Sequence, residues 1–199
     1  MKIYILRHED RTQDSTFFAP LTELGLNNSK KLSSILKKNN INLIFSSPFI
    51  RTLQTVKPFL KETGQMVNIE YGLSEIYYPD IIPPKSVGIT LPEYLAKQYN
   101  YNPNYETIIK PNEIKYPENK KDCENRMITV IRDIINKNWI KDINILIVTH
   151  QTLCTKMIKV LNKSCENHRK ELDIEFTKEY QRGKVCLIFD NGWTFEKLN

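Results

Sequence analysis

The sequence predicts an α/β fold, a three-layer α/β/α sandwich with a mostly parallel central sheet and an inserted segment rich in tyrosine and proline. Three observations favour this class. Short apolar runs typical of buried strands alternate with amphipathic helical stretches along most of the 199 residues. Strands that are separated by helices favour a parallel sheet covered on both faces. Only residues 76–121 interrupt the alternation.

The first half of the chain is expected to form strand, helix, strand, helix and strand, at residues 2–6, 22–39, 41–45, 48–62 and 66–70. Thr22 can cap the first helix because its hydroxyl can accept a hydrogen bond from a free backbone N–H. Glu23 then suits the positive end of the helix dipole. Pro48 is expected to open the second helix because its φ is already helical.

The second half continues the alternation. A helix is expected at 122–138, where apolar residues recur at helical spacing, followed by a strand at 143–148 and a helix at 152–161. Near the end, two strands at 185–189 and 193–198 flank Asp190-Asn191-Gly192, which is typical of a β-hairpin turn.

Residues 76–121 differ from the rest of the chain in composition. They hold seven of the ten tyrosines and seven of the ten prolines. A segment of this length without regular structure indicates a lid or a binding loop, and the tyrosines supply area that can be buried, which argues against disorder. We expect an insertion that packs over the sheet edge and over a functional site at that edge, with a short helix near 91–99, within a single domain spanning 1–199.

The composition is ordinary for a soluble globular protein, with 40% hydrophobic and 26% charged residues. No apolar stretch is long enough to span a membrane, and the first strand does not resemble a signal peptide. A cytoplasmic or nuclear location is therefore expected. The formal charge of +6 suits a protein that binds anions. Nucleic-acid binding is not expected, because the lysines are scattered rather than clustered.

The four cysteines show neither CxxC pairs nor metal-ligand spacing with the three histidines. They are interpreted as reduced structural thiols. No metal site is expected.

Two of the predicted strands end in motifs that can bind an anion. Arg7-His8 follows the first strand and Thr149-His150 follows the strand at 143–148, so both are expected at the carboxyl edge of the sheet, where open α/β folds build their sites. Arg51 lies one turn into a helix that begins at the same edge. A histidine beside arginines stays neutral near pH 7 and is a nucleophile toward phosphorus. Arginines bind phosphoryl oxygens with two donors.

These residues carry a family resemblance. Leu6-Arg7-His8, Leu21–Gly25, Phe45–Thr55 and Ile147–His150 resemble, in the same order, the motifs of the histidine phosphatase superfamily, which includes the cofactor-dependent phosphoglycerate mutases. The resemblance covers nearly the whole chain. It implies that His8 is the phosphorylated nucleophile and that Arg7, Arg51 and His150 hold the phosphoryl group.

A narrower resemblance is to the branch of the suppressor of T-cell receptor signalling phosphatases and ecdysteroid-phosphate phosphatase. That branch has an arginine three positions after the nucleophile, which Arg11 matches, and the stretches Tyr99–Pro103 and Asn119–Arg126 are also similar to it. Arg11 and Asp10 are therefore candidate substrate-binding residues. Glu75 matches the family's acidic residue after the third strand and is the favoured general acid, with Asp10 as the alternative.

Two positions depart from the family pattern. Glu9 stands where the family has glycine after the nucleophile, and Gln151 stands where a small residue is usual. A carboxylate that points into the site would repel phosphate and raise the pKa of His8, whereas one that points outward would be harmless.

The expected function is hydrolysis of a phosphomonoester through a phosphohistidine, with no metal and no organic cofactor. The aromatic insertion favours aryl or small-molecule phosphates, including phosphotyrosine, as substrates. One alternative is a catalytically weak member that serves as a binding subunit, since the branch that holds the fungal transcription factor tau subunit resembles the chain at similar motifs. Another is a phosphoglycerate mutase, which is disfavoured because residues 12–20 lack the long loop of mutases. A homodimer is compatible with the sequence.

Overall fold

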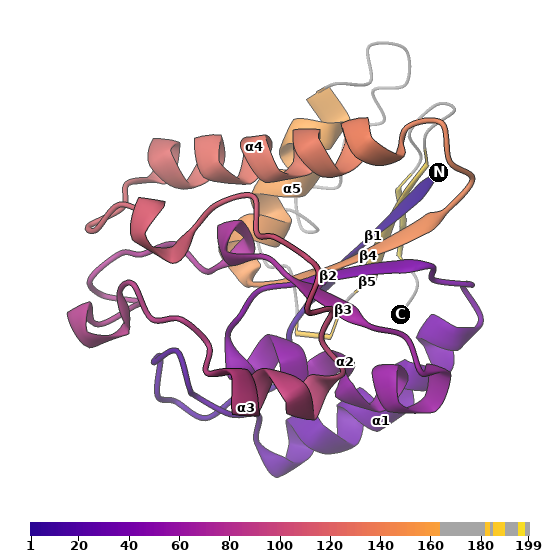
Figure 1. The fold of residues 1–199 in the computed structure, drawn as a ribbon, viewed down its shortest axis with the longest axis horizontal. Helices are drawn as coiled ribbons and strands as arrows, with labels where there is room; N and C mark the ends of the chain where they lie inside the picture. Colours follow the sequence, from indigo (N-terminus) through magenta and orange to yellow (C-terminus); the bar gives the residue numbers. More distant parts are fainter. Residues whose placement is uncertain (164–181, 184, 190–194, 198–199) are drawn as a thin grey trace.

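A computed structural model describes residues 1–163, 182–183, 185–189 and 195–197 of the chain. At its centre is a six-stranded sheet with the order β3-β2-β4-β1-β5-β6 (Figure 1). The strands are β1 (Lys2–Arg7), β2 (Leu43–Ser46), β3 (Val67–Ile69), β4 (Asn144–Thr149), β5 (Val185–Phe189) and β6 (Phe195–Lys197).

The sheet is mostly parallel, as predicted. β3, β2, β4 and β1 run in the same direction, and the register of β1 against β4 pairs Lys2 with Asn144 and Arg7 with Thr149. β5 pairs with β1 and with β6 in antiparallel fashion, which is the arrangement expected of the predicted hairpin. The turn Asp190-Asn191-Gly192 itself lies outside the described residues.

Helices cover both faces of the sheet, which confirms the three-layer α/β/α architecture (Figure 1). The helices are α1 (Glu23–Lys37), α2 (Ile50–Thr63), α3 (Glu93–Ala96), α4 (Lys120–Asn138) and α5 (Gln151–Lys163). α1, α2 and α3 lie on one side, and α4 and α5 on the other. Each face of the sheet has its own hydrophobic core, and successive strand residues alternate between them. Tyr4 and Leu6 belong to the core beneath α1 and α2, whereas Ile3 and Ile5 belong to the core beneath α4 and α5.

The helix starts follow the capping residues. Thr22 caps α1 by accepting a hydrogen bond from the Gly25 N–H at 3.1 Å, as predicted. Gly25 is required there, because a Cβ atom would lie 2.1 Å from the Asp10 carbonyl oxygen. α4 begins at Lys120, two residues before the expected start, because the side chain of Asn119 accepts from two backbone N–H groups.

The prediction that Pro48 opens the second helix is wrong. α2 begins at Ile50, and its N-cap is Phe49, whose backbone is extended with a ψ of 135°. Pro48 therefore lies outside the helix. Although α2 starts later than expected, Arg51 still lies in its first turn.

The segment 76–121 runs along the edge strand β3 and contributes α3 to the layer that holds α1 and α2. The Val67 N–H of β3 donates to the Asn100 carbonyl at 3.1 Å, and the Asn102 N–H donates to the Val67 carbonyl at 2.9 Å, so this part of the segment covers the edge strand. The short helix expected near 91–99 is present as α3 and the 3₁₀ turn Lys97–Tyr99. Tyr77 and Tyr99 are buried in the core.

Among the described residues, no helix is both long and apolar enough to cross a lipid bilayer.

Candidate active site

The carboxyl ends of three parallel strands bring the candidate residues together. The His8 N–H donates to the Thr149 carbonyl at 3.0 Å, and the Ser47 N–H donates to the Val148 carbonyl at 3.0 Å, so the parallel pairing continues just beyond the strands. The ring centroids of His8 and His150 are consequently 5.3 Å apart, in an edge-to-face arrangement. The sheet register therefore holds the two histidines next to each other.

One hydrogen bond fixes the tautomer of His8. Its Nδ1 lies 2.7 Å from the Glu9 carbonyl oxygen. A carbonyl oxygen only accepts, so Nδ1 carries the proton and the lone pair of the neutral ring is on Nε2. The orientation of the ring is thus set by the backbone of the next residue, and Nε2 is the nitrogen available for nucleophilic attack.

His8 is kept neutral by its surroundings. Burial lowers the pKa of His8 well below its ordinary value of 6.5, and the positive charge of Arg51 lowers it further, followed by Arg7 and Arg11. The hydrogen bond to Glu9 acts in the opposite direction but does not compensate. A neutral imidazole with a defined lone pair is the form that can attack phosphorus.

His150 is fully buried and presents one free nitrogen. Its Nε2 lies 2.8 Å from the Ser47 hydroxyl, whose oxygen also receives the Phe49 N–H at 3.4 Å. The Ser47 hydroxyl can donate its proton to Nε2 while accepting from Phe49, and in that tautomer of His150 the ring proton is on Nδ1. Among the described residues, Nδ1 has no hydrogen-bond partner. In this tautomer, Nδ1–H of His150 can donate to a phosphoryl oxygen.

The pKa of His150 is also lowered well below 6.5. Burial is the largest cause, and the positive charges of Arg51 and then of His8 and Arg7 add to it. Both rings are thus neutral at physiological pH, and the positive charge of the site comes from the arginines.

Arg51 is almost completely buried next to the histidines. Its guanidinium lies 4.5 Å from the centre of the Phe49 ring, and Nη1 donates to the Thr16 carbonyl at 3.0 Å. The Phe49 ring also contacts His150 edge-on, with ring centroids 5.0 Å apart. Phe49 therefore packs against both Arg51 and His150. Burial lowers the pKa of Arg51 to about 9. The side chain is still charged at neutral pH.

Two further arginines contribute charge. Arg7 is the last residue of β1, and burial lowers its pKa, whereas the nearby Glu75 raises it. Arg11 is held by its own loop, where Nη1 donates to the carbonyls of Thr12 at 2.6 Å and Asp14 at 2.9 Å. Arg11 is still close enough to lower the pKa of His8.

Glu75 lies at the same site, in the loop that follows β3 and the 3₁₀ turn Tyr71–Leu73. It is 7% exposed, and its Oε1 accepts from the Ile76 N–H at 2.9 Å. Its negative charge raises the pKa of both Arg7 and Arg51. The structure therefore brings the carboxylate close to two of the phosphate-binding candidates.

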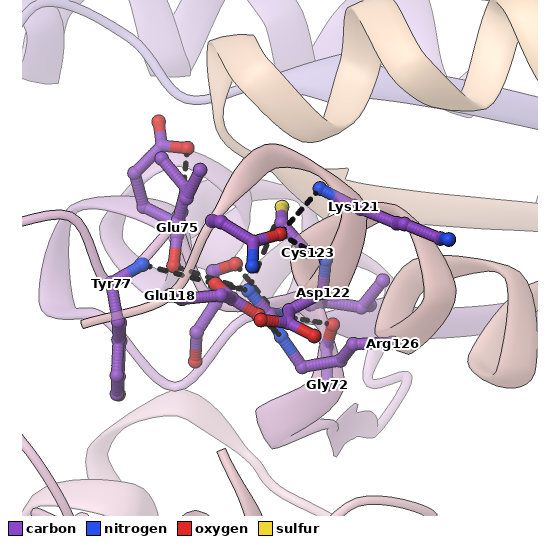
Figure 2. Close-up of polar contacts among 12 residues, drawn as sticks. Gly72, Glu75, Tyr77, Glu118, Lys121, Asp122, Cys123 and Arg126 are labelled. Carbon is purple, nitrogen blue, oxygen red and sulfur yellow. Dashed lines mark hydrogen bonds and ion pairs between the residues drawn. The ribbon is translucent and has the colours of Figure 1, made fainter. Parts of the chain in front are cut away.

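A buried ion pair supports the loop that carries Glu75 (Figure 2). Arg126 of α4 donates from Nε and Nη2 to the two carboxylate oxygens of Glu118, at 2.8 and 2.7 Å. Its Nη1 donates to the carbonyls of Gly72 at 2.7 Å and Ser74 at 3.0 Å. The loop is thus tied to α4 on both sides of Leu73, immediately before Glu75.

Asp10 has a different environment from Glu75. Its Oδ2 accepts from the Thr22 hydroxyl at 2.6 Å, and Oδ1 pairs with Arg182. Its carbonyl accepts from the Thr22 N–H at 3.0 Å. Asp10 therefore anchors the start of α1, with its carboxylate engaged by Thr22 and Arg182.

Glu9 points away from the phosphate-binding candidates. Its N–H donates to the Thr55 hydroxyl at 3.0 Å, and Oε2 accepts from the Asn28 side chain at 3.4 Å. The carboxylate also lies against Gly183, where a Cβ atom would be 2.0 Å from Oε1. Burial raises the pKa of Glu9. The carboxylate is therefore directed toward α1 and Gly183, and it is buried rather than turned to solvent.

Sequence reasoning missed four residues that shape the site: Ser47, Phe49, Glu118 and Arg126. Ser47 and Phe49 lie inside a family-like motif, but their partner His150 is 103 positions from Ser47 in the chain. Arg126 and the Gly72 carbonyl are 54 positions apart. Local spacing holds no signal for such contacts. Apolar periodicity predicted the helix itself, and only the resemblance of Asn119–Arg126 to one branch connected its start with the family.

Comparison with known proteins agrees with this geometry. The profile of the Histidine phosphatase superfamily (branch 1) matches residues 4–199. One curated relative, the transcription factor tau 55 kDa subunit of Saccharomyces cerevisiae, is 34% identical over 100 residues, which is 47% of this chain and 22% of that protein. The chain therefore matches about a fifth of the length of that relative.

Solved structures show the same fold. Ecdysone phosphate phosphatase from Bombix mori has a TM-score of 0.76 at 14% identity, covering 98% of this chain and 91% of that chain. The α-ribazole phosphatase from Shigella flexneri has a TM-score of 0.67 at 20% identity, covering 100% and 96%. The expected likeness to the ecdysteroid-phosphate phosphatase branch is confirmed at the level of the fold. Taken with the match over residues 4–199, these findings show that the chain belongs to branch 1 of the histidine phosphatase superfamily.

Proposed function

We propose that this chain hydrolyses phosphomonoesters through a phosphohistidine on His8, without a metal ion, and acts on aryl or other small-molecule phosphates. One observation carries the proposal. Nδ1 of His8 donates to the Glu9 carbonyl at 2.7 Å, so the lone pair of a neutral ring is on Nε2, beside guanidiniums that bind phosphoryl oxygens.

In the first step, Nε2 of His8 attacks phosphorus. A P–N bond forms and the P–O bond to the leaving group breaks. Arg7, Arg51 and Nδ1–H of His150 stabilise the charge on the phosphoryl oxygens, which is the main catalytic demand of phosphoryl transfer. Protonated Glu75 gives its proton to the leaving oxygen, which departs as an alcohol or a phenol.

In the second step, water attacks the phosphorus of the phosphohistidine. The P–N bond breaks, the Glu75 carboxylate accepts a proton from the water, and inorganic phosphate leaves. His8 returns to its neutral form and Glu75 to its protonated form. Two solved proteins of the same fold bind an oxyanion, the Bombix mori enzyme in complex with tungstate and the mycobacterial glucosyl-3-phosphoglycerate phosphatase with inorganic phosphate, which supports oxyanion binding by this fold.

The test is hydrolysis of 4-nitrophenyl phosphate between pH 5 and 8 in the presence of EDTA. The expected result is turnover that survives EDTA and falls by about 10³-fold or more in His8→Ala. A thermal melt of the variant by circular dichroism controls for its fold. Equal activity in wild type and variant would contradict the proposal. Turnover of phosphoglycerates far above that of aryl phosphates would contradict the substrate class.

A second candidate function is that of a binding subunit with little turnover. The similarity to the yeast transcription factor tau subunit favours it. Under this proposal the chain would serve as a subunit of a larger assembly. The contact of the Glu9 carboxylate with Asn28 argues against it, because the side chain that replaces glycine is engaged by α1. Failure of the wild type to hydrolyse any phosphomonoester, with the fold intact, would favour the binding subunit.

A further inference from the structure

A large cavity adjoins the candidate active site. Its volume is about 810 Å³, and its wall includes Ile76, the residue after Glu75, and Gln151, the residue after His150. The cavity wall therefore includes the chain neighbours of both groups, whose Cα atoms are about 3.8 Å from those of Glu75 and His150. In the proposed reaction Glu75 protonates the leaving oxygen, so the rest of the leaving group has to extend from the vicinity of Glu75.

One part of the cavity wall is apolar. Tyr78 and Ile81 belong to the insertion and are 46% and 37% exposed, which is high for such large side chains. Ile76 and Val160 of α5 complete this surface. Apolar and aromatic side chains around a concave site typically bind a flat hydrocarbon or aromatic body.

The rest of the wall is polar: Asn119, Gln151, Thr152 and Thr155 are uncharged, and the charged residues are mostly basic. Lys120, Lys156 and Lys159 line the cavity together with one acidic residue, Glu124, which gives a net charge of +2. Lys156 is paired with Glu124 at 2.9 Å. In the described part of the chain, neither Lys120 nor Lys159 forms an ion pair with a carboxylate, and both are exposed.

The position of Lys120 adds to the positive potential. It is the first residue of α4, where the helix dipole already places a partial positive charge. A lysine at that end is unfavourable for the helix itself and favourable for an anion bound nearby. The cavity therefore combines an apolar surface with uncompensated positive charge.

We propose that this cavity binds the leaving group of the substrate, and that the leaving group is an aromatic body carrying a second anionic substituent such as a carboxylate. The inference rests on the proposed function, because it assumes that the phosphoryl group binds at His8. The volume is in the range that holds a whole small ligand, so the phosphoryl site and the cavity together select for a doubly anionic aryl phosphate.

The experiment measures binding without turnover. Benzylphosphonate and (4-carboxybenzyl)phosphonate are titrated calorimetrically into wild type, into Lys120→Gln/Lys159→Gln and into Lys31→Gln/Lys61→Gln. The last variant removes the same two charges from exposed lysines of α1 and α2, on the opposite side of the sheet. We expect wild type and the control to bind the carboxylated compound about five- to tenfold more tightly, and the cavity variant to lose this preference.

A second variant tests the apolar surface. Tyr78→Ala should weaken the binding of both phosphonates by a similar factor, and should leave the affinity for inorganic phosphate unchanged. Equal affinity of the two phosphonates in wild type would overturn the inference, as would a preference that survives in Lys120→Gln/Lys159→Gln.

Hydrolysis of phenyl phosphate, measured in parallel, separates the two proposals. His8-dependent hydrolysis without a carboxylate preference would overturn the cavity assignment and leave the proposed function intact. A carboxylate preference without any hydrolysis would support the cavity as a binding site and contradict the phosphatase proposal.

Discussion

Arg126 and Glu118 form a bidentate ion pair beneath the loop of Glu75, with N–O distances of 2.8 and 2.7 Å, and both side chains are buried. The remaining Arg126 donors bind the carbonyls of Gly72 and Ser74. Glu118 also accepts from the Tyr77 N–H at 3.0 Å, so the pair holds the loop on both sides of Glu75 (Figure 2).

Arg126→Met should destabilise the protein by about 3–5 kcal/mol, because it leaves the Glu118 carboxylate buried without its partner. The double variant Glu118→Met/Arg126→Met removes both charges and should lose less stability than Arg126→Met alone. Urea unfolding followed by circular dichroism measures both. A double variant less stable than either single variant would show that the pair does not act through charge burial.

Glu75→Gln should slow the hydrolysis of alkyl phosphates by about 10²–10⁴-fold, because the leaving oxygen then receives no proton. 4-Nitrophenyl phosphate should be affected much less, since its leaving group departs without protonation. The kinetics of both substrates, measured for Glu75→Gln and for the control Asp10→Asn, check this. A larger loss in Asp10→Asn, at matched thermal stability, would assign the acid to Asp10 instead.

Ser47→Ala should reduce kcat/KM by up to about tenfold, since the net value of one hydrogen bond is about 1 kcal/mol. The hydroxyl lies 2.8 Å from Nε2 of His150, and by donating to Nε2 it would hold the ring proton on Nδ1. Ser46→Ala is the matched control, because Ser46 is also buried and donates to the Ser47 carbonyl instead. Equal effects of the two substitutions would argue against a tautomer role.

The stability of the protein should fall as the pH drops below about 6.5. Both His8 and His150 have a lowered pKa in the folded state, with burial as the main cause. The unfolded chain, whose histidines titrate near their ordinary value of about 6.5, then binds more protons than the folded chain. Each histidine should contribute up to about 1.4 kcal/mol of lost stability per pH unit.

His8→Asn isolates the contribution of one histidine. The slope of unfolding free energy against pH, measured by urea denaturation between pH 6.5 and 5, should be smaller in this variant than in wild type. Wild-type kcat/KM should persist below pH 6.5 for the same reason, because His8 stays neutral. Identical slopes in the two proteins would show that His8 is protonated as readily in the folded state as in the unfolded one.

The regular elements could be predicted because their signals are local. Thr22 caps α1 as expected, and the strand at 185–189 was predicted with the bounds it has in the structure. The prediction for Pro48 failed because proline is compatible with a helix start but does not require one, and the extended backbone of Phe49 decides where α2 begins. The insertion pairs with β3 through Asn100 and Asn102, a contact that no local pattern indicates.

By itself, the sequence determined the α/β class, the order of the elements and the motifs that end β1 and β4, because strand and helix periodicity and the positions of Arg7, His8 and His150 are properties of short segments. The tertiary structure alone decided the pairing of His150 with Ser47, the contact of the Glu9 carboxylate with Asn28 and the support of Glu75 by Arg126. Each of these depends on a hydrogen-bond partner that only the packing of distant elements brings near, and such contacts cannot be read from residue spacing.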